Sequence, residues 1–186
     1  MEALWISTAI VAVAEIGDKT QLLAIMLAAR FKRPLTILAG IFAATLLNHA
    51  LAATAGYWLA QWLSGRTFQL VVGAAFVAMA AWALIPDKED DGAAQMSRGG
   101  VFLTTLVAFF LVEIGDKTQI ATSLLAARFQ DIALVTVGTT LGMMLANAPA
   151  VYLGEAATRI VALRYVRMAA ALLLAVTGVW VIVSAL

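Results

Sequence analysis

The chain is poor in the residues that build most catalytic, redox and disulfide sites. It has no cysteine and one histidine among its 186 residues. Without cysteine, disulfides, thiolate metal ligands and cysteine nucleophiles are excluded, while the cellular compartment stays open. Charged side chains make up only 12% of the chain, and the net charge of +1 comes without a basic cluster. We therefore expect no enzyme activity, no prosthetic group and no nucleic-acid partner.

Apolar residues, in contrast, make up 63% of the chain, and the mean hydropathy is +0.97. A soluble domain is nearer half apolar and a quarter charged. Six runs reach the roughly 20 apolar residues that a membrane span needs, over residues 3–29, 35–63, 67–86, 101–127, 131–154 and 163–185. We expect an all-α integral membrane protein with six transmembrane helices. The N-terminus lacks the positive region of a signal peptide, so the first run is expected to be retained.

One seven-residue motif, E-I-G-D-K-T-Q, occurs twice, over residues 15–21 and 113–119, at an offset of 98 residues. Without gaps, the same offset pairs further residues: Arg30 with Arg128, Gly40 with Gly138, Gly56 with Gly154, Arg66 with Arg164, and Trp82 with Trp180. This agreement predicts two copies of one three-helix unit. Because three is odd, the second copy enters the membrane upside down. The sequence therefore predicts an inverted repeat of the kind found in secondary transporters.

The predicted domains are a first repeat over residues 1–86, a short acidic linker over 87–100 and an inverted second repeat over 101–186. Most basic residues fall on the side of the membrane that holds the linker: Arg30, Lys32, Arg33, Lys88, Arg98, Arg159, Arg164 and Arg167. That side should be cytoplasmic, which puts both termini outside a cytoplasmic (inner) membrane. The acidic run at 87–91 is interpreted as a solvated linker, with a cation-collecting entrance as the alternative.

Each motif places three ionisable groups in the middle of an apolar run. Each such group costs roughly 2.5–3.5 kcal/mol at the centre of a transmembrane helix, so the groups must face the bundle interior. On a continuous helix, Glu15, Asp18 and Lys19 share one face, and Glu15 can pair with Lys19 at i,i+4. The same reasoning pairs Glu113 with Lys117. Four carboxylates and two lysines leave a net charge of −2, which one divalent cation would cancel.

The candidate metal ligands are the four motif carboxylates, Glu15, Asp18, Glu113 and Asp116. Further polar residues at similar depth are candidates for a supporting role: Thr20, Gln21, Thr118, Gln119, Asn48, Asn147, Lys19 and Lys117. Oxygen ligands suit Mg²⁺, Ca²⁺ and Mn²⁺. Carboxylates in a dry cavity also take up protons when the cation leaves. The same groups can therefore hold either a metal ion or protons, and the lysines are alternatively tethered cations that fill an empty site.

Two features have more than one interpretation. Gly17 and Gly115 either let the motif helices unwind or allow close packing against the opposite copy. His49, whose counterpart in the second repeat is Asn147, is interpreted as a hydrogen-bonded packing residue, with a proton relay as the alternative. Gly138 and Gly142 form a G-x-x-x-G pattern that predicts close helix approach.

At both motifs the sequence resembles the Gdt/transmembrane protein 165 family of cation/proton exchangers, whose mark is E-x-G-D-[KR]-[ST] in the first and fourth of six helices. The match covers the whole chain, and the short form is similar to the family's bacterial MneA-type manganese exporters. The resemblance implies that Mn²⁺, and in some members Ca²⁺, moves out of the cytoplasm in exchange for protons. It also implies ion binding by Glu15, Asp18, Glu113 and Asp116.

We therefore expect a secondary active transporter that works by alternating access around a four-carboxylate site in mid-membrane. Its substrates would be a divalent cation, Mn²⁺ or Ca²⁺, and protons, and a homo-oligomer is compatible with the sequence. The alternatives are a passive divalent-cation channel, an exporter of a small basic solute and a structural subunit of an assembly.

Overall fold

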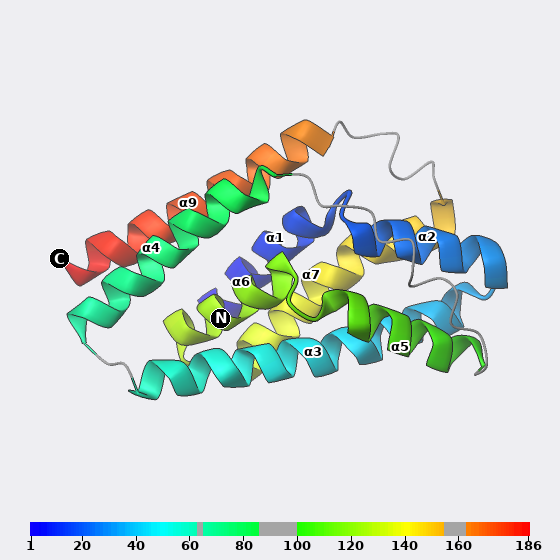
Figure 1. The fold of residues 1–186 in the computed structure, drawn as a ribbon, viewed down its shortest axis with the longest axis horizontal. Helices are drawn as coiled ribbons and strands as arrows, with labels where there is room; N and C mark the ends of the chain where they lie inside the picture. The colour runs from blue at the N-terminus through cyan, green and yellow to red at the C-terminus, as the bar shows by residue number, and fades with distance from the viewer. Residues whose placement is uncertain (63–64, 86–99, 155–162) are drawn as a thin grey trace.

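The computed structural model describes residues 1–62, 65–85, 100–154 and 163–186. These residues form eight α-helices (Figure 1): α1 (Glu2–Glu15), α2 (Lys19–Phe31), α3 (Pro34–Trp62), α4 (Arg66–Ala83), α5 (Val101–Glu113), α6 (Lys117–Phe129), α7 (Ile132–Leu153) and α9 (Leu163–Ala185). The predicted acidic linker lies outside the described residues except for Gly100, and so do the predicted cytoplasmic residues Lys88, Arg98 and Arg159.

Four of the helices, α3, α4, α7 and α9, are long and apolar enough to cross a membrane. They carry large apolar side chains on their outer faces as well as in the core. Leu51 on α3, for example, is 54% exposed, and Leu145 on α7 is 61% exposed. A helix that is apolar on all sides is typical of a membrane span, because lipid replaces water around it. The protein is therefore a multi-pass membrane protein.

The prediction of continuous helices over residues 3–29 and 101–127 is wrong. Each run is split at its motif, between α1 and α2 and between α5 and α6. Gly17 and Gly115 adopt φ values of +80° and +78°, a region that favours glycine because it has no Cβ. The interpretation that these glycines let the motif helices unwind is thereby confirmed. The assignment of Glu15, Asp18 and Lys19 to one helical face fails, because no helix runs through them.

The two broken pairs lie antiparallel, and each packs on a long helix of the other repeat. α7 packs against α1, and α3 packs against α5 and α6. The glycines allow these approaches: a Cβ on Gly138 would lie 2.6 Å from the Leu4 carbonyl oxygen, and one on Gly40 would lie 2.7 Å from Thr105 Cβ. The predicted close helix approach at Gly138 is confirmed, and its partner is α1.

α4 and α9 form a separate pair that leans across the remaining helices (Figure 1). They touch backbone to backbone, since a Cβ on Gly73 would lie 2.9 Å from the Gly178 carbonyl oxygen. This pair meets the rest of the molecule mainly through α1 and α6. The space between the pair and the two helix breaks holds the cavity described below.

Candidate metal centre

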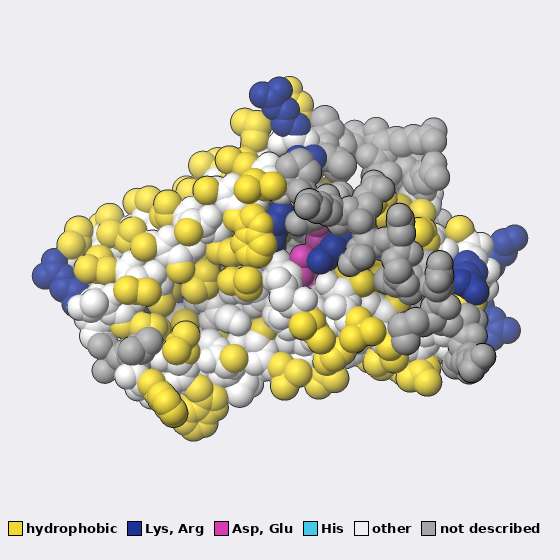
Figure 2. All heavy atoms as spheres, viewed as in Figure 1, with side chains coloured by type: hydrophobic (Ala, Val, Ile, Leu, Met, Phe, Trp, Pro, Cys, Tyr) yellow, Lys and Arg dark blue, Asp and Glu magenta, His cyan; other side chains and the backbone are white. Residues whose placement is uncertain are grey.

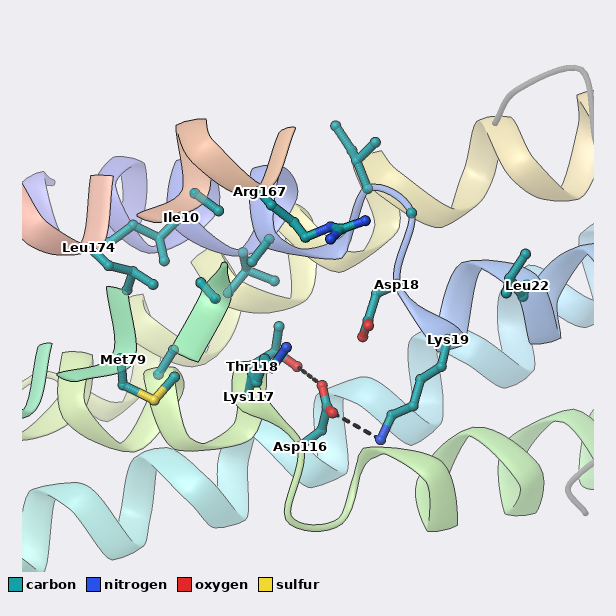
Figure 3. A pocket seen from close by; sticks show the side chains of 17 residues that line it. Ile10, Asp18, Lys19, Leu22, Met79, Asp116, Lys117, Thr118, Arg167 and Leu174 are labelled. Atoms are coloured by element: carbon teal, nitrogen blue, oxygen red, sulfur yellow. Dashed lines mark hydrogen bonds and ion pairs between the residues drawn. The ribbon is translucent and has the colours of Figure 1, made fainter. Parts of the chain in front are cut away.

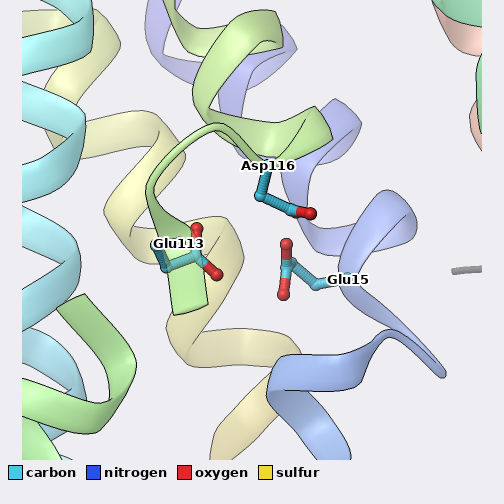
Figure 4. Close-up of side chains that lie close together, drawn as sticks. All are labelled: Glu15, Glu113 and Asp116. Carbon is cyan, nitrogen blue, oxygen red and sulfur yellow. The ribbon is translucent and has the colours of Figure 1, made fainter. Parts of the chain in front are cut away.

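Three buried carboxylates converge where the two helix breaks meet. Glu15 and Glu113 end α1 and α5, and Asp116 directly precedes α6. One oxygen from each lies within 4.8 Å of the others, and the exposed fractions of the three residues are 0%, 0% and 5%. Figure 4 shows the three carboxylates pointing toward one another. With metal–oxygen bonds of about 2.0–2.6 Å, two ligands on opposite sides of one ion lie roughly 4–5 Å apart, so the cluster has a suitable size for one cation.

Electrostatic repulsion makes this cluster unfavourable without a counter-charge. Two ionised carboxylates less than 4.8 Å apart repel by roughly 3–4 kcal/mol at an effective dielectric constant of 20. Three such pairs approach the whole folding free energy of a typical domain, about 5–15 kcal/mol. A counter-charge must therefore offset this repulsion, and the ammonium of Lys19, whose Nζ lies 2.9 Å from Asp116 Oδ1, supplies part of it.

Threonine hydroxyls donate hydrogen bonds to all three carboxylates. Thr20 Oγ1 donates to Glu15 Oε2 at 2.5 Å, and Thr118 Oγ1 donates to Glu113 Oε2 at 3.2 Å and to Asp116 Oδ2 at 3.3 Å. The other oxygens of the glutamates, Glu15 Oε1 and Glu113 Oε1, are buried and accept no hydrogen bond from the described residues. Each glutamate thus keeps one oxygen available for an ion.

The motif glutamines close the helix breaks. Gln21 Oε1 accepts from the Gly17 N–H at 2.8 Å, and Gln119 Oε1 accepts from the Gly115 N–H at 2.7 Å. Gln21 also donates to the Ala146 carbonyl of α7 at 2.9 Å. The amide oxygens of both glutamines are thus occupied by the motif glycines and help to hold the left-handed turns; a supporting role for Gln21 and Gln119 in ion binding stays a prediction.

The predicted pairing of Glu15 with Lys19 is wrong, because Lys19 reaches across to the other motif. Its Nζ lies 2.9 Å from Asp116 Oδ1, and the Lys19 side chain is 23% exposed. The helical i,i+4 geometry assumed for Glu113 and Lys117 does not exist either, because the helix breaks between them. Lys117 donates to the Ile85 carbonyl at 2.7 Å, with its ammonium 5.7 Å from the centre of the Trp82 ring.

Asp18 is not in the three-carboxylate cluster but lines a cavity beside it. The cavity has a volume of about 230 Å³ and is bounded by the first helix break, α4, α6 and α9. Figure 3 shows the Asp18 carboxylate pointing toward the Lys19–Asp116 pair. On the surface, acidic side chains show at the bottom of a hollow between basic ones (Figure 2). The structure therefore brings together three of the four predicted carboxylates and places the fourth, Asp18, in the wall of the cavity beside them.

Arg167 also lines this cavity, and its guanidinium points toward the Asp18 side (Figure 3). From the sequence alone, Arg167 is only one of the basic residues expected on the cytoplasmic side. Arg167, Ala170 and Leu174 have the spacing of one helix face and all three line the cavity, but the sequence does not show which face of that helix meets the motif.

The polar residues of the long helices differ between the repeats. Asn48 Nδ2 donates to the Phe110 carbonyl of α5 at 3.0 Å, whereas Asn147 Nδ2 donates to Met143 of its own helix, at 3.1 Å to the carbonyl oxygen and 3.0 Å to Sδ. Both amide oxygens are buried and accept no hydrogen bond from the described residues. His49 is fully buried, and neither ring nitrogen forms a hydrogen bond with them. The interpretation of His49 as a hydrogen-bonded packing residue is therefore wrong.

Comparisons with known proteins agree with this chemistry. The family model described as "Divalent cation/proton antiporter GDT1" matches residues 3–91 and 101–186. The chain is 53% identical over 156 residues to a protein of Vibrio cholerae serotype O1 named "Putative manganese exporter", an alignment that covers 83% of this chain and 78% of the relative. No solved structure matches the chain. The protein is thus a transporter and not an enzyme, and it belongs to the GDT1 family of divalent cation/proton antiporters.

Proposed function

We propose that the protein exports Mn²⁺, with Ca²⁺ as a second candidate, from the cytoplasm in exchange for protons. The observation that carries this proposal is the meeting of Glu15, Glu113 and Asp116 at two helix breaks. The choice of Mn²⁺ is supported by the name of the Vibrio cholerae relative. Glu15, Glu113 and Asp116 bind the ion in this conformation, and Asp18 joins the site as an entrance ligand.

The proposed membrane fold has six spans in two inverted repeats, residues 1–86 and 101–186, joined by the linker at 87–100. α1 with α2, and α5 with α6, each act as one broken span, with 14 and 13 residues in the first pair and 13 in each helix of the second. At 1.5 Å per residue each pair is long enough for a hydrocarbon core of about 30 Å. The family model matches in two segments, residues 3–91 and 101–186, and the interruption falls within the linker, which supports this division.

Alternating access is supported by two cavities that the offset of 98 residues relates. The cavity beside the acidic cluster is lined by Ala83, Arg167 and Ala170, among others. A second cavity of about 270 Å³ is lined by their counterparts, Val181, Gln69 and Val72. We propose that each cavity is the pathway from the site to one side of the membrane. The structure would then represent the state in which the first pathway reaches the carboxylates.

In this mechanism Lys19 and protons replace the departing cation. The Lys19 ammonium occupies one face of Asp116, where a divalent ion would otherwise supply the positive charge. An arriving ion displaces it, and the repulsion among the three carboxylates is then relieved by the ion. When the ion leaves on the other side, protons take its place on the carboxylates.

The proposed orientation puts both termini outside a cytoplasmic membrane. Both ends of the chain lie toward the same end of the molecule, opposite to the turn between α2 and α3 with Arg30, Lys32 and Arg33 (Figure 1). Positive residues favour the cytoplasmic side. The first cavity lies where α4 ends and α9 begins, so in this orientation it is the cytoplasmic pathway. A homo-oligomer stays a prediction.

The test is uptake into proteoliposomes that contain the purified protein, with Mn²⁺, Ca²⁺ and Mg²⁺ in competition at two internal pH values. We expect saturable Mn²⁺ uptake that is driven by a proton gradient and reduced by Ca²⁺. Mn²⁺ flux that does not depend on the pH gradient would overturn the exchange mechanism, and flux that does not saturate would indicate a channel.

A further inference from the structure

The histidine of the chain lies beside the acidic cluster and forms no hydrogen bond with the part of the chain that the structure describes. His49 is 0% exposed, in the middle of α3. Neither Nδ1 nor Nε2 forms a hydrogen bond with any described residue. Burying a polar group without a hydrogen bond is unfavourable. A neighbouring group or a bound ligand is therefore expected to interact with the imidazole nitrogens.

The neighbour is Glu113. His49 Nε2 lies 4.0 Å from Glu113 Oε2, and the Glu113 side chain is also fully buried. That distance is too long for a hydrogen bond. It falls within the range of about 3–5 Å that separates two atoms bound to one ion with bonds of roughly 2.0–2.6 Å. The imidazole is thus placed where it can share a cation with Glu113, and it lies outside the group of three carboxylates whose oxygens are all within 4.8 Å of one another.

We propose that His49 is a nitrogen ligand that makes the site select Mn²⁺ over Ca²⁺ and Mg²⁺. This inference rests on the proposed function and names the residue that sets its substrate preference. Ca²⁺ and Mg²⁺ take oxygen ligands almost exclusively, whereas an imidazole nitrogen suits transition metals. Binding of the ion beside Glu113 would add this imidazole to the oxygen ligands, and the resulting mixed donor set is one that Mn²⁺, a transition-metal ion, accepts and Ca²⁺ does not use fully.

The second repeat has no equivalent nitrogen donor. The counterpart of His49 is Asn147, whose amide nitrogen donates to Met143 and whose amide oxygen accepts no hydrogen bond from the described residues. An amide in this position offers an oxygen ligand only. The substitution His49→Asn therefore gives the first repeat the side chain of the second and exchanges a nitrogen donor for an oxygen donor.

The first experiment is pulsed electron paramagnetic resonance of Mn²⁺ bound to tag-free protein in nanodiscs. Because the chain has one histidine, coupling of Mn²⁺ to an imidazole nitrogen identifies the ligand, and labelling with ¹⁵N-histidine should change the coupling. We expect this coupling in the wild type and its loss in His49→Asn. Bound Mn²⁺ that shows no histidine nitrogen coupling would overturn the inference and leave the proposed function intact.

The second experiment measures competition between Mn²⁺ and Ca²⁺ for binding to the same two proteins. We expect His49→Asn to weaken Mn²⁺ binding about tenfold, the order found when a metal site loses one supporting interaction, with Ca²⁺ binding changed by less than about threefold. Retained Ca²⁺ binding also shows that the variant folds. An equal loss of both ions would overturn the role in selectivity. If neither ion binds the wild type, the proposed function itself fails.

Discussion

The two copies of the motif have nearly the same backbone and different side-chain partners. Their glycines adopt φ values of +80° and +78°, and the glutamine oxygens accept from the glycine N–H groups at 2.8 and 2.7 Å. The turns that follow α2 and α6 also correspond, since Lys32 and Gln130 adopt φ values of +53° and +54°. The local sequence therefore dictates one backbone shape in both copies.

The lysines of the two motifs do not follow this symmetry, because they make different contacts. Lys19 pairs with Asp116 of the other motif, whereas Lys117 lies over the Trp82 ring. The counterpart of Trp82 is Trp180, and its ring holds Arg128 at 4.8 Å. Identical sequences in different contacts indicate that either contact set is accessible to either repeat. In the proposed alternating mechanism, the opposite state should then have the exchanged contacts, with Lys117 directed to Asp18 and Lys19 to Trp180.

The largest expected effect comes from removing the carboxylate charge of either motif. Asp116→Asn removes a member of the buried cluster and the partner of Lys19, and Asp18→Asn removes the equivalent charge in the exchanged state. We expect each substitution to lower Mn²⁺ flux in proteoliposomes by at least about 100-fold, beyond the range typical of supporting groups. Expression and thermal stability serve as controls. Full activity in both variants would remove the site assignment.

A smaller effect, and one that should be equal in the two copies, is expected at the glycines of the helix breaks. Gly115→Ala places a Cβ in open space but at a φ of +78°. The left-handed conformation costs an L-residue about 1–2 kcal/mol, and Gly17→Ala should cost the same. Thermal unfolding in detergent measures both, with Ala121→Gly in α6 as a control for helix propensity. If only one of the two substitutions, Gly17→Ala or Gly115→Ala, left the unfolding temperature unchanged, the two helix breaks would not be equivalent.

The lysines should respond unequally, which tests the asymmetry directly. Lys19→Met removes the ammonium that competes for Asp116, so we expect apparent Mn²⁺ affinity to rise by about fivefold, as for an ion pair of about 1 kcal/mol. Lys117→Met should change the affinity by less than about twofold, because its ammonium is directed to α4. Calorimetry or a metal-dependent thermal shift on both variants provides the comparison, and equal effects would contradict it.

The smallest expected effect is a change in chemical labelling as the two cavities alternate. The chain lacks cysteine, so a single cysteine can be placed at Gln69 or at Arg167, which line the two cavities at equivalent positions. Without metal we expect the cysteine at 167 to react faster with a water-soluble maleimide. Mn²⁺ together with an outward proton gradient should shift the labelling rates at positions 69 and 167 in opposite directions. The expected change is about twofold when the two states have comparable populations. Rates that rise or fall together would argue against alternation.

Much of the architecture could be predicted from the sequence. The long apolar runs become α3, α4, α7 and α9 with ends within a few residues of those expected, because helix length in a membrane is set by apolar composition. The glycine pattern at Gly138 correctly predicts close packing, although it does not identify α1 as the partner. The helix breaks at Gly17 and Gly115 are one of two interpretations that the sequence allows, because a glycine within an apolar helical pattern does not reveal its own φ.

The side-chain contacts of the acidic site could not be predicted from residue spacing. Assuming an unbroken helix, the sequence pairs Glu15 with Lys19, but the break turns the lysine toward Asp116 on the other motif. Arg167 and His49 reach the site from α9 and α3, helices that no spacing rule connects to the motif. Such contacts depend on how separate helices cross.

By itself the sequence determined that the protein spans a membrane, that it contains a doubled unit and that charge lies at its centre. These properties follow from composition and periodicity, which act locally along the chain. The tertiary structure alone decided which three carboxylates converge, which lysine faces them and that a buried imidazole, which has no hydrogen bond to the described residues, stands beside them. Those choices depend on Coulomb and packing interactions between residues about a hundred positions apart, and such interactions exist only after the helices have come together.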